Sequence, residues 1–124
     1  MKRAIETARA PKPIGPYSQA TVVNGFVFLS GLIPITPDGI LTKGDIVSEF
    51  KTIIGNAAAI LTEAGSSLEK VVKVTVFMTD LSSFDAMNKA YSEVFKPPFP
   101  ARSTVQVASL PKAVDLEIDM IAYV

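Results

Sequence analysis

The sequence contains no cysteine and no histidine among its 124 residues. Their absence excludes thiolate chemistry, Ser–His–Asp catalysis, and zinc or haem sites that depend on sulfur or imidazole ligands. It also excludes disulfides, so the fold must depend on packing. Carboxylates alone could hold a hard metal ion, but no run of Asp and Glu has the spacing of a calcium loop. We therefore expect neither a metal nor a cofactor, and any acid–base step falls to Asp, Glu, Lys, Tyr or a water molecule.

Strong net charge and long apolar runs are also missing. Twelve Lys and Arg residues balance twelve Asp and Glu residues, and the absence of a basic stripe disfavours a nucleic-acid partner. No apolar run reaches the ~18 residues of a membrane span, and the N-terminus lacks the apolar stretch of a signal peptide. We expect a cytoplasmic protein without a membrane partner. A mitochondrial location would require that a presequence has been removed.

The patterned segments predict a single α+β domain over residues 1–124. A proline-rich arm at 10–19 precedes a hairpin whose turn is Asn24-Gly25, a strong hairpin signal. Gly65 should end the first helix with a left-handed backbone conformation, and Ser82 and Asp85 have the spacing of a capping box at the start of the second. The predicted helices span 46–64 and 81–95, and the predicted strands span 3–7, 20–23, 26–33, 71–78, 101–108 and 114–124. We expect a mostly antiparallel sheet with both helices on one face.

The second face of this sheet should also be buried. Strands 26–33 and 71–78 are apolar on both faces, whereas two helices can cover only one. Since soluble monomers avoid large exposed apolar patches, we expect the second face to pack against other subunits. Arg102 and Glu117 would then lie at or near subunit boundaries, where clefts suit small molecules.

Arg102 and Glu117 are the strongest candidates for a site. If the last two strands form a hairpin in which Val107 pairs with Val114, Glu117 lies across from Thr104 with Arg102 diagonal to both, within reach of long side chains. The pair is either a salt bridge on a solvated face, which would carry little information, or a clamp for a small polar substrate. The residue types leave both interpretations open.

Two further positions have the same ambiguity. Tyr17, in the arm, is either a surface anchor or a phenol directed into a site. Ser30-Gly31 interrupts an apolar strand, which indicates either a bulge or a close backbone approach with a free N–H for an anionic group.

Seven segments together resemble the RidA (YjgF-type) family of reactive-intermediate deaminases. None would be specific alone, but together they extend over essentially the whole chain in the family's order. They are residues 14–19 (IGPYSQ), 29–34 (LSGLIP), 71–77 (VVKVTVF), 88–91 (NKAY), 100–103 (PARS), 110–111 (LP) and 117–122 (EIDMIA). The resemblance implies a chorismate-mutase-like fold, assembled as a homotrimer with sites between subunits. It also implies cofactor-free hydrolysis of 2-aminoacrylate-type enamines and their 2-imino acid tautomers, such as 2-iminopropanoate and 2-iminobutanoate, to 2-keto acids and ammonia.

The resemblance also implies roles for individual residues. Arg102 would bind the substrate carboxylate, and Glu117 would activate water or move the proton. Tyr17 and Ser30 would orient the water and the substrate nitrogen. The Gly31 N–H would help to hold the bound acid. Asn88 either lines the pocket or is a structural helix residue.

One position departs from the family's pattern and bears on the alternatives. Many relatives have Cys two residues after the arginine, where this chain has Thr104, so a thiol-dependent mechanism is excluded. Two other functions are a non-catalytic regulator that binds small carboxylates and an endoribonuclease or translation inhibitor. Retention of both Arg102 and Glu117 favours catalysis, because binding alone needs only the arginine. The zero net charge and the lack of histidine disfavour the ribonuclease.

Overall fold

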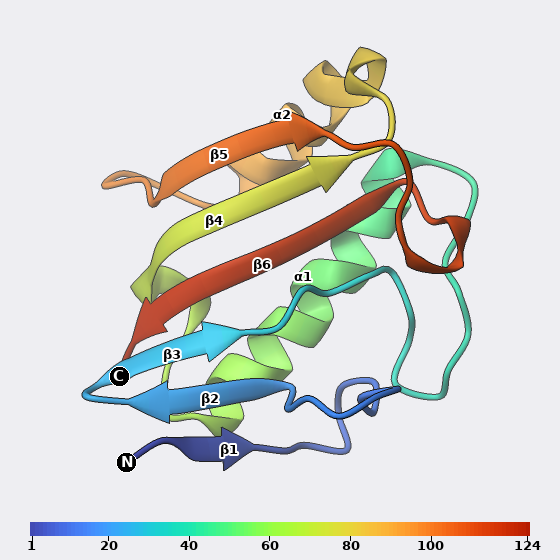
Figure 1. The fold of residues 1–124 in the computed structure, drawn as a ribbon. Helices are drawn as coiled ribbons and strands as arrows, with labels where there is room; N and C mark the ends of the chain where they lie inside the picture. Colours follow the sequence, from blue (N-terminus) through green and yellow to red (C-terminus); the bar gives the residue numbers. More distant parts are fainter.

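The computed structural model describes residues 1–124 as a six-stranded sheet with two α-helices on one face (Figure 1). None of the helices is both long and apolar enough to cross a membrane. The predicted α+β architecture is confirmed. The elements are β1 (Arg3–Ile5), β2 (Ala20–Val23), β3 (Phe26–Leu29), α1 (Ile46–Glu63), η1 (Leu68–Lys70), β4 (Val71–Met78), η2 (Leu81–Ser83), α2 (Phe84–Val94), β5 (Ala101–Gln106), η3 (Pro111–Ala113) and β6 (Leu116–Tyr123).

The strand order is β1-β2-β3-β6-β4-β5. All neighbours pair antiparallel except β4 and β5, which are parallel because α2 forms the crossover between them. The predicted hairpin of the last two strands is therefore wrong: β6 lies between β3 and β4, and β5 is an edge strand. Alternation along a strand predicts which side chains share a face, but it does not identify the neighbouring strand.

The helix boundaries follow local signals. Asp45 caps α1 by accepting a hydrogen bond from the Ser48 amide at 2.8 Å. Gly65 ends the helix with a φ of 81°, as predicted. The predicted capping box of Ser82 and Asp85 is wrong. Instead, Asp80 accepts from the Ser82 amide at 2.8 Å and caps η2, and α2 begins afterwards without a side-chain cap.

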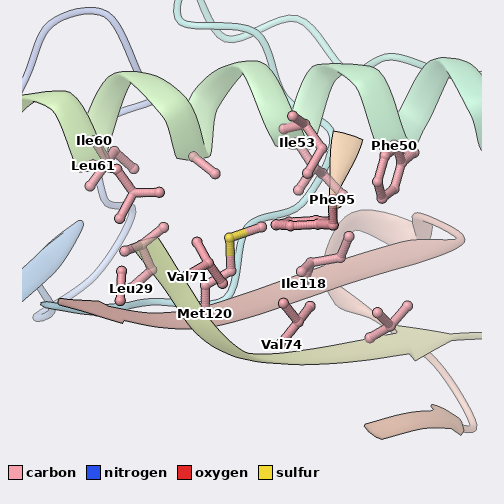
Figure 2. Close-up of a cluster of buried hydrophobic side chains, with 14 of the residues drawn as sticks. Leu29, Phe50, Ile53, Ile60, Leu61, Val71, Val74, Phe95, Ile118 and Met120 are labelled. Atoms are coloured by element: carbon pink, nitrogen blue, oxygen red, sulfur yellow. The ribbon is translucent and has the colours of Figure 1, made fainter. Parts of the chain in front are cut away.

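The core lies between α1 and the covered face of the sheet (Figure 2). One stripe of α1, which includes Phe50, Ile53 and Leu61, packs on alternate residues of β4 and β6, such as Val74 and Ile118. The alternation of β6 is complete: Leu116, Ile118, Met120 and Ala122 are buried. The odd-numbered residues of β6 therefore face the other side of the sheet.

That other side has no helix over it, and large apolar side chains are exposed there. Phe26 pairs with Tyr123 across β3 and β6, and both side chains are 45% exposed. Phe28 and Val105 are each 40% exposed. The structure of the single chain thus has the predicted second sheet face, which is apolar and is not covered by a helix.

Candidate active site

The carboxylate of Glu117 lies against the backbone of Gly31. A methyl group on the Gly31 Cα would lie within 2.9 Å of Glu117 Cδ and closer still to Oε2. Because the φ of Gly31 is not in the left-handed region, glycine is needed for space and not for backbone conformation. Leu32 and Ile118 fix this approach by exchanging two backbone hydrogen bonds of 2.8 and 3.0 Å.

Ser30 lies where β3 ends and the chain turns toward β6. Its amide donates to the Gln19 carbonyl at 3.0 Å, and its hydroxyl donates to the Ser18 carbonyl at 2.6 Å. The proton of the hydroxyl is therefore already used. The oxygen can still accept a hydrogen bond from a substrate N–H or from a water.

The proline-rich arm is held in place by one buried side chain, Gln19, which is only 4% exposed. Its carbonyl accepts from the Thr7 amide at 2.7 Å, and its NH2 group donates to the carbonyls of Thr7 at 3.1 Å and Pro11 at 2.8 Å. Tyr17 lies earlier in the same arm. Its side chain is half exposed, and its hydroxyl accepts from the Ile14 amide at 3.4 Å. These hydrogen bonds hold the arm in a defined conformation.

A cavity of about 410 Å³ lies between this arm and the loop after β3. Three predicted site residues line it together, namely Tyr17, Ser30 and Gly31. Most of the remaining lining comes from the arm and the loop. These residues are Ala8, Ala10, Pro11, Lys12, Pro13, Ile14, Gln19, Leu32, Ile33, Ile35, Pro37, Asp38, Gly39 and Lys112. Glu117 is not a lining residue and is linked to the cavity only through its proximity to Gly31. We refer to Tyr17, Ser30, Gly31 and Glu117 as the Glu117 group.

Arg102 lies elsewhere, on the helix-covered face of β5. Its register partner is Val74, a fully buried core residue. The guanidinium carbon is 4.6 Å from the ring centroid of Tyr91 and 5.7 Å from that of Phe84, both in α2. Stacking on two rings holds the planar guanidinium by cation–π attraction.

Thr104 and Asn88 belong to the same region. Thr104 follows Arg102 by two residues and points to the same face, where its register partner is the buried Val76. The hydroxyls of Thr104 and Tyr91 are buried without a hydrogen-bond partner. Asn88 is exposed on α2, four residues after Phe84 and three before Tyr91, which places it on the same side of the helix. We refer to Asn88, Arg102 and Thr104 as the Arg102 group.

The side chains of Glu117 and Arg102 project from opposite faces of the sheet. Glu117 pairs with Phe77, and Phe77 pairs with Val105 on the uncovered face. Arg102 shares the covered face with Val74 and its other partner on β6. The expectation that Arg102 and Glu117 lie diagonally on one face is therefore wrong for a single chain, and so is the simple salt bridge between them.

Burial tunes the ionisable groups at both places. Partial burial raises the pKa of the Glu117 carboxyl, and the nearby Asp119 raises it further. Glu117 is thus a stronger base than an exposed glutamate. Burial also raises the pKa of the Tyr91 phenol, against the opposing effect of Arg102.

Sequence reasoning missed several residues of these regions. Tyr91 and Phe84 were not identified as candidate site residues, although their rings support Arg102. Lys112 was not identified, yet it lines the cavity with a φ of 57°. Positive φ at a lysine has no signal in the local sequence, whereas the proline before it could have indicated a turn.

Comparisons with known proteins place the whole chain among related sequences. The family model described as Endoribonuclease L-PSP matches residues 7–124. A RutC family protein of Pyrococcus abyssi is 54% identical over 123 residues, which are 98% of this chain and 97% of the relative. The human 2-iminobutanoate/2-iminopropanoate deaminase is 42% identical over 123 residues, covering 98% of this chain and 90% of the relative.

A solved structure shows the same fold with a small molecule bound. The crystal structure of Escherichia coli TdcF with bound serine aligns with a TM-score of 0.92 at 42% identity. The alignment covers 98% of each chain. Serine is an amino acid with a carboxylate and a short side chain, so this relative binds a small carboxylate.

Proposed function

The chain belongs to the RidA (YjgF-type) family, whose model is described as Endoribonuclease L-PSP, and we propose that it is a cofactor-free hydrolytic deaminase of 2-imino acids. The substrates are 2-aminoacrylate with its tautomer 2-iminopropanoate, and 2-iminobutanoate. The products are the corresponding 2-keto acid and ammonia. Relatives with about 42% identity that bear this activity in their names support the proposal.

The single observation that carries the proposal is the position of Glu117. Its carboxylate lies against the backbone of Gly31, and Gly31 lines, with Ser30 and Tyr17, a cavity wide enough for a small acid. Its pKa is raised by burial, which suits a general base because an ordinary carboxylate is too weak a base at neutral pH.

The reaction needs few groups. Glu117 takes a proton from water as the water oxygen bonds to the imine carbon and the C=N π electrons move to nitrogen. That proton returns to nitrogen and gives a carbinolamine. The proton of its hydroxyl then moves to the same nitrogen as the C–N bond breaks, so that the carbonyl forms and ammonia leaves. Ser30 accepts a hydrogen bond from the substrate nitrogen or from the water, and Tyr17 closes the same cavity. Most of the catalysis comes from positioning these reactants.

Arg102 completes the site from a neighbouring subunit. Because Arg102 and Glu117 leave opposite faces of their own sheet, a site that uses both must combine two chains. The exposed apolar face that includes Phe26, Phe28 and Val105 supports such an assembly. We propose a homotrimer in which the Arg102 guanidinium of one subunit binds the substrate carboxylate beside Glu117 of the next.

A coupled assay tests the function. A serine dehydratase generates 2-aminoacrylate, and the release of 2-keto acid is followed with and without this protein. Acceleration that is lost in Arg102→Ala and in Glu117→Ala, but kept in the exposed-surface control Lys51→Ala, supports the proposal. Tight binding of 2-oxobutyrate without acceleration would indicate a regulator, and RNA cleavage that survives both substitutions would indicate a ribonuclease. Either result would overturn the proposal.

A further inference from the structure

Glu49 is a buried carboxyl that the proposed reaction does not use. It lies in the first turn of α1 and is only 2% exposed. Burial of an ionisable group is costly unless the group has a specific partner. Glu49 therefore needs a structural explanation, and its single hydrogen bond supplies one.

That bond joins α1 to the start of β6. Glu49 Oε1 accepts from the Asp115 amide at 3.2 Å. The carbonyl of Asp115 accepts from the Thr79 amide at 3.2 Å, and its carboxylate accepts from the Thr79 hydroxyl at 3.3 Å. Asp115 is thus held by Thr79, directly after β4, and by Glu49 in α1.

The position of Asp115 determines where β6 starts, and therefore where the Glu117 side chain lies relative to Gly31. Only one residue, the fully buried Leu116, separates the two acids. The fit at Gly31 leaves no room for even a methyl group. A small displacement of the start of β6 would therefore move the Glu117 carboxylate relative to Ser30 and the cavity.

We propose that Glu49 is a positioning residue for Glu117: by anchoring the Asp115 amide to α1, it fixes the start of β6 and thereby the seat of the Glu117 carboxylate on Gly31. The inference rests on the proposed deaminase function. Glu49 itself touches neither substrate nor reacting atoms. Its effect on the reaction is through β6 alone.

The anchor also titrates. Burial raises the pKa of Glu49 from 4.5 to about 7, with Asp115 and Asp45 adding repulsion. Two negative groups thus face it, Asp115 from the start of β6 and Asp45 from the N-cap of α1. The hydrogen bond from the Asp115 amide favours the ionised form of Glu49, but burial and the repulsion of both carboxylates outweigh it. Ionisation therefore disfavours the buried position of Glu49, and the anchor weakens as pH rises through about 7.

Glutamine provides the matched test because it is isosteric with protonated glutamic acid and does not ionise. In the wild-type protein we expect the kcat for 2-iminopropanoate to fall several-fold between pH 6 and pH 8.5. In Glu49→Gln we expect the wild-type rate at pH 6 without that fall at higher pH. Glu49→Ala should lower kcat by about tenfold at pH 6 with little change in KM, because misplacement affects the transition state more than binding. Glu63→Gln, exposed on the same helix, is the control and should keep the wild-type profile.

Amide hydrogen exchange separates this inference from the proposed function. We expect the protection of the Asp115 amide to decrease above pH 7 in the wild type and to stay constant in Glu49→Gln. An active wild-type enzyme whose pH profile and Asp115 protection are unchanged in Glu49→Gln would overturn the inference alone. Absence of deaminase activity in the wild type would overturn the proposed function. Protection of the Asp115 amide that does not depend on Glu49 would overturn the anchor whatever the activity.

Discussion

The Glu117 group and the Arg102 group are built in different ways. The Glu117 group depends on backbone: Gly31 has no side chain, the Ser30 hydroxyl is bonded to a carbonyl, and Leu32 and Ile118 exchange main-chain hydrogen bonds. The Arg102 group depends on side chains, with the guanidinium resting on the Tyr91 and Phe84 rings. One group is therefore sensitive to volume, and the other is sensitive to charge and stacking.

The two groups also differ in how complete they are within one chain. In the Glu117 group, Tyr17, Ser30 and Gly31 line a cavity, and the Tyr17 and Ser30 hydroxyls are hydrogen-bonded. The Arg102 group includes a buried Thr104 hydroxyl without a partner. The guanidinium of Arg102 rests on the ring of Tyr91, whose hydroxyl also has no partner. Since buried polar groups are nearly always hydrogen-bonded, this region is the one that is suited to gain partners from a ligand or a second chain.

The strongest test of this comparison mixes two dead variants. We expect Glu117→Ala and Arg102→Ala each to lower kcat/KM by roughly 10³-fold, since each removes a group that no other residue replaces. When equal amounts of the two are unfolded and refolded together, random assembly should pair an intact Glu117 with an intact Arg102 in about a quarter of the sites. Activity near that fraction is expected in the deaminase assay. Mixtures that stay inactive would contradict a site shared between chains.

Gly31→Ala should break the Glu117 group alone. The new methyl group displaces the Glu117 carboxylate, so we expect kcat to fall by about 10²-fold. We expect little change in the free energy of unfolding, because the displaced atoms belong to a flexible side chain. Steady-state kinetics and urea denaturation measure the two effects. Gly55→Ala is the control, because a methyl group on Gly55 meets nothing within 4 Å, and in the helix it should be neutral or stabilising. Wild-type kinetics for Gly31→Ala would show that Glu117 is not seated there.

Arg102→Lys should affect the Arg102 group in binding more than in rate. Lysine keeps the charge but loses the planar fork and the stacking on Tyr91. We expect KM for the imino acid to rise by about tenfold with a smaller change in kcat. Arg9→Lys, at an exposed position directly before the arm, should leave both constants unchanged. An equal loss in kcat for Arg102→Lys would mean that Arg102 acts on the transition state.

Tyr91→Phe has the smallest expected effect. It removes a buried hydroxyl that has no partner and keeps the ring under Arg102. We expect the free energy of unfolding to be unchanged or higher by up to ~1 kcal/mol, because an unsatisfied polar group is costly. Thermal or urea denaturation measures it. A clear loss of stability, or a tenfold loss of activity, would show that the hydroxyl is bonded in the assembled protein.

The helices and the faces of the strands could be predicted from the sequence because both follow from periodic burial. The break at Ser30-Gly31 and the end of α1 at Gly65 carried local signals that the structure confirms. The partner of β5 carried none. Its alternation separates Arg102 and Thr104 from Ser103 and Val105 equally well in either orientation.

The prediction of the sheet face that Arg102 occupies was wrong for a physical reason. Apolar side chains usually face the helices, yet Val105 is exposed and Arg102 lies under α2. The aromatic rings of α2 make this arrangement favourable, and they could not be assigned to Arg102 before the crossover between β4 and β5 was known. The candidate residues could thus be identified from the residue pattern together with the family's motifs, whereas their division into two groups required the fold.

The edge position of β5 has a consequence for how the protein would be regulated and handled. In the proposed assembly, no subunit holds a complete site, so specific activity is set by protein concentration as well as by substrate. Dilution below the dissociation constant of the assembly would switch the reaction off without altering any residue. Activity measured across a dilution series would then report the strength of the subunit contacts directly.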